Sequence, residues 1–192
     1  DSMNIQCGHE IVFELSAPTS LLLMLYIHPS RSGTCQKPDV LHVTPPVSIK
    51  SHIDHYGNRG AILTSNAGPL RIFSDNIVSD TGALDLVAPW AIQHNIADLP
   101  PDTIQFLLAS RYCDIERLSA LEYALFGQSP MGWGRVQAIC DWVHQNIKFG
   151  YEFARPTKTA FEGYTERTGV CRDFMHLAIA FCRCMNIPAR YA

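Results

Sequence analysis

Residues 169–176 place a cysteine at the start of an amphipathic helix, and this pairing could do chemistry. Gly169 predicts a turn before the helix, while Asn186 and Pro188 predict its end. Cys171 is therefore expected in the first helical turn, where free backbone N–H groups and the positive end of the helix dipole converge. Apolar side chains follow the cysteine at the spacing of one helical face: Phe174, Leu177, Ala178, Phe181, Cys182 and Met185.

Such a position suits a cysteine that attacks carbonyl groups. A helix start favours the thiolate, which is the nucleophilic form of cysteine. The same N–H groups could stabilise the oxyanion that forms when the thiolate attacks. The alternative is that Cys171 is a small buried hydrophobic residue, as most free cysteines are. The chain has seven cysteines, so the residue type alone leaves both interpretations open.

The amino-acid sequence of this segment resembles that of one protein family. Gly-Val-Cys-Arg-Asp-Phe-Met-His-Leu begins at Gly169, and Ile-Pro-Ala-Arg follows from Ile187. Together they resemble the bacterial transglutaminase-like cysteine proteases. The resemblance implies that Cys171 is the catalytic nucleophile and that a histidine and an aspartate come from strands after the cysteine helix. No such strand precedes Ala192, so we expect an incomplete triad and an inactive, or nearly inactive, fragment.

Nearby polar residues are weaker candidates. His176 lies five positions after Cys171, which on an ideal helix is a rotation of about 140° and a rise of about 7.5 Å. It cannot reach the thiolate, so we expect a core histidine hydrogen-bonded to a neighbouring strand or loop. Asp173 should complement the helix dipole, pairing with a basic side chain. His144, from the preceding helix, is a remote candidate for the base.

Three upstream aromatic residues could support the oxyanion. The wider superfamily places a polar or aromatic side chain there, and Trp133, Tyr151 and Tyr164 are the residues to consider. The alternative, which we favour, is that they are packing residues with a polar tip.

A metal site is disfavoured. Cys182 and Cys184 could join His176, but they point about 200° apart on a helix. No second ligand pair has zinc spacing. We therefore expect neither a metal nor a cofactor.

The composition excludes several classes of protein. The chain has 192 residues and a formal net charge of -3, with a pI near 6.2. It has no basic run, which argues against a nucleic-acid partner. The longest apolar run, 21–27, is far shorter than the roughly 20 residues that cross a bilayer. No signal peptide opens the chain, and an odd, scattered set of cysteines suits reduced thiols, so we expect a cytoplasmic protein without a membrane partner.

Residues 3–90 are predicted to form an antiparallel β-sandwich or barrel domain. Strands are expected at 10–15 and 21–28, followed by a run at 40–53 that Pro45-Pro46 breaks. Residues 54–58 should form a turn between antiparallel strands. Further strands are expected at 61–64, 69–73 and 77–78. The candidate inward residues of the broken run are Val43, Val47, Ile49 and Ile53.

Residues 91–114 are predicted to be an extended linker, because prolines block long helices there. From residue 115 the apolar period becomes helical, with helices expected at 115–125, at 135–147 and in a short stretch after Thr159. The fold class is therefore α+β, with residues 115–192 forming the helical part of a transglutaminase-like, or papain-like, core.

The function expected from the resemblance is thiol-dependent acyl transfer on amide bonds through a cysteine thioester. The substrate would be a protein or peptide. The site could be completed by a missing C-terminal segment or by another copy in a homo-oligomer. The alternative is a non-catalytic binding or scaffold protein with a relic cysteine site.

Overall fold

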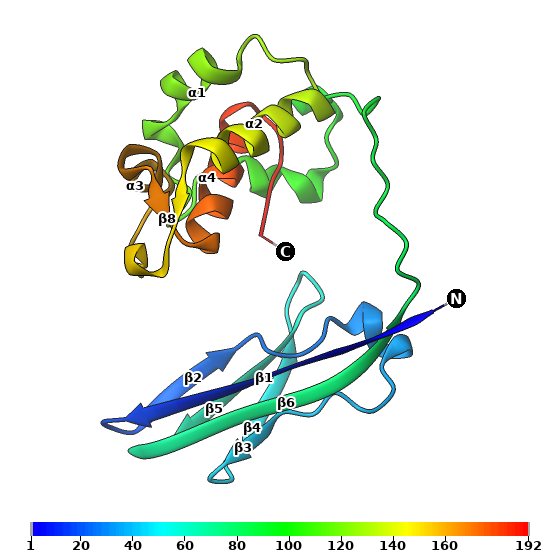
Figure 1. Ribbon diagram of the computed structural model, residues 1–192, viewed down its shortest axis with the longest axis vertical. Coiled ribbons are helices and arrows are strands. Elements are labelled where there is room, and N and C mark those ends of the chain that lie inside the picture. Colours follow the sequence, from blue (N-terminus) through cyan, green and yellow to red (C-terminus); the bar gives the residue numbers. More distant parts are fainter. Residues whose placement is uncertain (1, 192) are drawn as a thin grey trace. The chain divides into compact units, whose positions relative to one another are not determined.

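The computed structural model describes residues 2–191 and divides into two units, Asp1–Asp85 and Leu86–Ala192 (Figure 1). The first unit is built of strands and the second mostly of helices. The α+β class expected from the sequence is therefore confirmed. Within the described residues, none of the helices has the length and hydropathy needed to cross a bilayer.

Two antiparallel three-stranded sheets make up the first unit. One sheet has the order β1-β6-β3, and its long strands pair in register from Met3 opposite Asp80 to Leu15 opposite Gly68. The other has the order β2-β5-β4. The bounds are β1 Met3–Leu15, β2 Thr19–Leu23, β3 His42–Thr44, β4 Ile49–Ile53, β5 Arg59–Ser65 and β6 Gly68–Asp80, with a 3-10 helix η1 at Pro29–Thr34.

Inward residues from both sheets form the core of this unit. Leu63, Leu70 and Ile72 are buried, and Val43, Val47 and Ile49 pack against them as expected. Ile53 was expected to point inward, but it is 61% exposed. It is the last residue of β4, where the strand enters the turn. Both sheets are open, so the described residues form no closed barrel. Of the two expected architectures, the barrel is therefore not present.

The helical unit begins near residue 115, but the single helix expected at 115–125 is divided into the 3-10 helix Ile115–Arg117 and the α-helix Ser119–Phe126. The short helix expected after Thr159 is present as α3, with Thr159 as its N-cap. The bounds are η2 Ile96–Asp98, η3 Pro101–Leu107, η4 Ile115–Arg117, α1 Ser119–Phe126, α2 Trp133–Asn146, β7 Lys148–Phe149, η5 Tyr151–Phe153, α3 Ala160–Glu166, β8 Thr168–Gly169 and α4 Cys171–Cys184.

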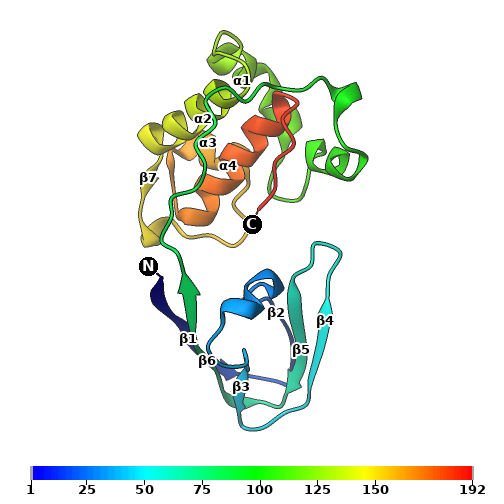
Figure 2. The ribbon, with the colours of Figure 1, turned by 90° about the vertical axis from the view of Figure 1, so that its right-hand side faces the viewer.

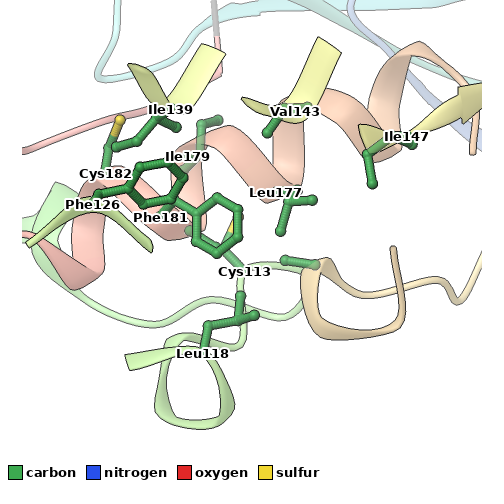
Figure 3. Close-up of a cluster of buried hydrophobic side chains, with 12 residues drawn as sticks. Cys113, Leu118, Phe126, Ile139, Val143, Ile147, Leu177, Ile179, Phe181 and Cys182 are labelled. Carbon is green, nitrogen blue, oxygen red and sulfur yellow. The ribbon is translucent and has the colours of Figure 1, made fainter. Parts of the chain in front are cut away.

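α4 is the central helix of this unit, and α1, α2 and α3 pack around it (Figures 1 and 2). Phe181 lies in the core beside Phe126, edge-on with ring centroids 5.2 Å apart (Figure 3). It is also edge-on to Trp142, at 5.5 Å. Ile179 and Ala180 are also buried, although they lie outside the predicted apolar face. A helix enclosed by neighbours on several sides buries more than one stripe.

Residues 91–114 contain the short helices η2 and η3, and they contact α4 and its end. The Gln93 side chain donates to the Met185 carbonyl at 2.7 Å, and the Ala189 N–H donates to the Phe106 carbonyl at 3.2 Å. The division of the sequence into 3–90, 91–114 and 115–192 stays a prediction.

Candidate active site

Cys171 is the first residue of α4, and its side chain is exposed. The segment before it belongs to a small parallel sheet, in which Lys148 pairs with Thr168 and Phe149 with Gly169. Figure 1 shows β8 and α3 beside the orange start of α4. The sulfur is therefore at the opening of the helix, as the turn and the apolar spacing predict, and not in the core.

Asp173 caps this helix start from within. Its Oδ2 accepts a hydrogen bond from the Val170 N–H at 2.9 Å, and the residue is 3% exposed. A Cβ at Gly169 would lie 2.7 Å from the Asp173 Cβ, closer than real Cβ contacts allow. Glycine at 169 therefore makes room for the capping aspartate. The expected basic partner is Arg172, whose Nη2 lies 3.5 Å from Asp173 Oδ1.

Two backbone N–H groups remain open at the helix start. The Val170 carbonyl accepts from the N–H groups of Asp173 and Phe174 at 2.8 and 3.2 Å. Among residues 2–191, nothing accepts a hydrogen bond from the N–H of Cys171 or of Arg172. These two donors, beside the sulfur, are the groups available to an oxyanion.

A cluster of charged side chains surrounds the segment that leads to Cys171. Arg155 Nη2 lies 3.1 Å from Glu162 and 2.9 Å from Glu166. Lys158 Nζ lies 3.0 Å from Glu166 Oε2 and also donates to the Thr168 carbonyl at 3.0 Å. These contacts hold the pKa of the Glu166 carboxyl below its usual range.

Arg172 connects the same cluster to the residue after Cys171. Its Nη2 donates to the Arg155 carbonyl at 2.7 Å. The sequence-based interpretation included none of Arg155, Lys158 and Arg172. Their signal was weak: Lys158 stands in the Thr157-Lys158-Thr159 run that predicted an N-cap, and a lysine there is normally exposed.

His176 does not have the hydrogen bonds that we expected. Its ring stacks on Tyr112, with centroids 5.2 Å apart and planes inclined by 5°, and Nδ1 is buried without a partner among residues 2–191. Burial and the Arg172 charge lower the pKa of His176, against the opposing effect of Asp173. Stacking therefore replaces the expected hydrogen bond, and His176 is half-buried and not a core residue.

The three aromatic candidates lie in different surroundings. Trp133 lines a groove of about 330 Å³ with Asn186 and Pro188, at the opposite end of α4 from Cys171. Tyr164 stacks on Trp142 at 5.6 Å, so it is a packing residue. Tyr151 is 78% exposed and follows β7, the strand that pairs with Thr168 and Gly169 just before Cys171.

The remaining candidates lie apart from the thiol. His144 is exposed in the last turn of α2, and no hydrogen bond joins a histidine to Cys171 among residues 2–191. Burial raises the pKa of the Cys182 and Cys184 thiols to about 12. No three histidine, cysteine or acidic side chains among these residues are grouped so that they could hold a metal ion.

Comparison with known proteins gives two matches. Residues 121–192 match the family model of the transglutaminase-like superfamily. The chain is also similar to the crystal structure of a provisionally assigned cysteine protease from Cytophaga hutchinsonii, with 28% sequence identity and a TM-score of 0.81. The similarity covers 98% of this chain and 65% of that one. No curated protein matches the chain.

Both findings support the resemblance of the residues around Cys171 to the transglutaminase-like cysteine proteases. The family match includes α2, α3 and the whole of α4, and therefore the cysteine and every member of the charged cluster. This chain spans 65% of the length of the solved relative.

Proposed function

We propose that Cys171 is the nucleophile of a thiol-dependent acyl transfer on the amide bonds of a protein or peptide. The observation that carries the proposal is the exposed sulfur at the start of α4, beside two open backbone N–H groups. The match to the transglutaminase-like superfamily supports the same residue.

The proposed reaction has two steps. The Cys171 thiolate attacks the amide carbonyl carbon, and the carbonyl oxygen takes negative charge beside the N–H groups of Cys171 and Arg172. The C–N bond then breaks, the amine leaves with a proton from a general acid, and a thioester remains. Water would release the acid, whereas a second amine would form a new amide.

A general base is needed for both steps, and residues 2–191 place no histidine on the thiol. We therefore also propose that the general base and the acid that orients it lie outside the described residues, as the family resemblance implies. It follows that the 192-residue chain alone should not turn over a substrate.

Alkylation tests the nucleophile without needing the base. We expect Cys171 to react with iodoacetamide at neutral pH faster than the same cysteine in the urea-unfolded chain, as followed by peptide mass spectrometry. Cys140, also exposed but on α2, is the matched control within the same chain. If Cys171 reacts no faster than its unfolded counterpart, the alternative of a non-catalytic protein with a relic cysteine is favoured.

A further inference from the structure

Lys158 is buried to an unusual degree. It is 1% exposed, although it lies in a connection between η5 and α3 and not in a hydrophobic core. Lysine is among the residues least often fully buried, because removing an ammonium from water has a large desolvation cost. A buried lysine therefore needs partners that compensate for this cost.

The partners of Lys158 lead toward Cys171. Its Nζ lies 3.0 Å from Glu166 Oε2 and 3.0 Å from the carbonyl oxygen of Thr168, three residues before the cysteine. Glu166 is shared with Arg155, at 2.9 Å. One ammonium thus connects the end of α3 to the backbone of β8.

The residue after the cysteine is also tied to the segment that carries Lys158. The carbonyl of Arg155 accepts from Arg172 at 2.7 Å, and Arg172 directly follows Cys171. Lys158 therefore holds the backbone before the sulfur, and the side chain of the residue after the sulfur, Arg172, is tied to the backbone of Arg155. Replacing a buried ion pair by apolar residues often leaves stability unchanged, so stability alone gives no reason for a lysine here.

We propose that Lys158 is a positioning residue for Cys171: by fixing the Thr168 carbonyl against Glu166, it sets where the sulfur and the open N–H groups of α4 lie. The proposal rests on the proposed function of Cys171. Lys158 itself does not touch the reacting atoms, and its effect passes through residues 168–170.

The test compares Lys158→Met with wild type by alkylation of the 192-residue chain with iodoacetamide. Loss of the ammonium should free the Thr168 carbonyl, and the Cys171 rate should fall by roughly three- to tenfold toward that of the unfolded chain. Cys113 and Cys182 are 4% and 7% exposed, so their alkylation reports general loosening. They should stay protected in the variant.

Lys148→Met is the matched control. Lys148 is exposed and stands opposite Thr168 in the small sheet, and its ammonium lies 5.8 Å from the Phe153 ring. The same substitution there should leave the Cys171 rate unchanged. An equal fall in both variants would show a general effect of charge and would overturn the proposal.

The remaining outcomes also test the proposal. If Cys171 reacts as fast in Lys158→Met as in wild type while Cys113 and Cys182 stay protected, the proposal is wrong. If Lys158→Met unfolds, Glu166→Gln is tested instead, because this variant keeps Lys158 and removes the carboxylate that it pairs with. An unchanged alkylation rate of Cys171 in Glu166→Gln overturns the proposal. Wild-type Cys171 that reacts no faster than the unfolded chain would instead refute the proposed function.

Discussion

The two ends of α4 differ in kind although they belong to one helix. At its first turn, Cys171 is exposed and surrounded by charged groups that bind backbone atoms. Toward its other end, Cys182 and Phe181 are buried among aromatic and aliphatic side chains. The difference shows that the environment, and not the residue type, separates a candidate nucleophile from a packing cysteine.

The largest effect on stability is expected at the apolar end of α4. Phe181 is fully buried and contacts the rings of Phe126, Trp142 and Tyr164. Phe181→Ala should lower the free energy of unfolding by about 3–5 kcal/mol, because it removes apolar contacts and leaves a cavity. Urea denaturation followed by circular dichroism measures this loss. A loss below about 1 kcal/mol would contradict the central place of Phe181 in the core.

The free energy of unfolding should also depend on pH, through a buried carboxyl near the apolar end of α4. Glu122 on α1 is 1% exposed, and within the described residues its Oε1 has no hydrogen-bond partner. Burial raises the pKa of Glu122 from 4.5 to about 7, against the opposing charge of Arg135. Its charge acts on Cys182 and Cys184 of α4.

The folded state therefore holds this proton more tightly than the unfolded chain. The stability that the protonated Glu122 contributes is fully present below pH 4.5. It is lost as the pH rises through about 7, and the free energy of unfolding falls by up to about 3 kcal/mol. Denaturation at several pH values measures it. Glu122→Gln should remove this fall, and an equal fall in the variant would show that other groups cause it.

A smaller effect is expected from Gly169→Ala at the polar end. The new Cβ would lie 2.7 Å from the Asp173 Cβ, so the cap must shift. We expect a loss of about 1–3 kcal/mol in the free energy of unfolding and slower alkylation of Cys171.

Gly163→Ala is the control for this substitution. A Cβ at Gly163 would meet nothing within 4 Å, and the residue lies inside α3. There alanine should stabilise the protein by roughly 0.5–1 kcal/mol, because it favours the helix. If both variants change stability equally, the contact with Asp173 has no special weight.

The smallest effect on stability is expected at Cys171 itself. Cys171→Ser should change the free energy of unfolding by less than about 0.5 kcal/mol, since the side chain is exposed. Cys182→Ser places a hydroxyl in the apolar core and should cost about 1–3 kcal/mol. Thermal denaturation of the two variants measures the contrast. Equal losses would remove the distinction between the two ends of α4.

The features predicted well are those that local sequence determines. The cysteine at the helix start, the Thr159 cap and the end of α4 near Asn186 all depend on adjacent residues. Asn186 indeed adopts a left-handed conformation, with φ of 60°. The assignment of Cys171 as the nucleophile stays a prediction.

Features that depend on distant partners were not predictable. β6 runs unbroken from Gly68 to Asp80, whereas the sequence pattern divided it, because its inward Ser74 and Asn76 are polar. Asn76 is accommodated by donating to the Lys37 carbonyl, 39 residues away. Lys158 is a similar case, since its burial depends on Glu166 and Thr168.

One further consequence concerns chain length within α4. The sulfur and the buried Leu177 are carried by the same continuous helix, with no loop between them that could absorb a change. Inserting or deleting a single residue there would swing Cys171 by about 100° relative to the core. Sequence drift in residues 171–177 should therefore proceed by replacement of side chains and never by insertions or deletions.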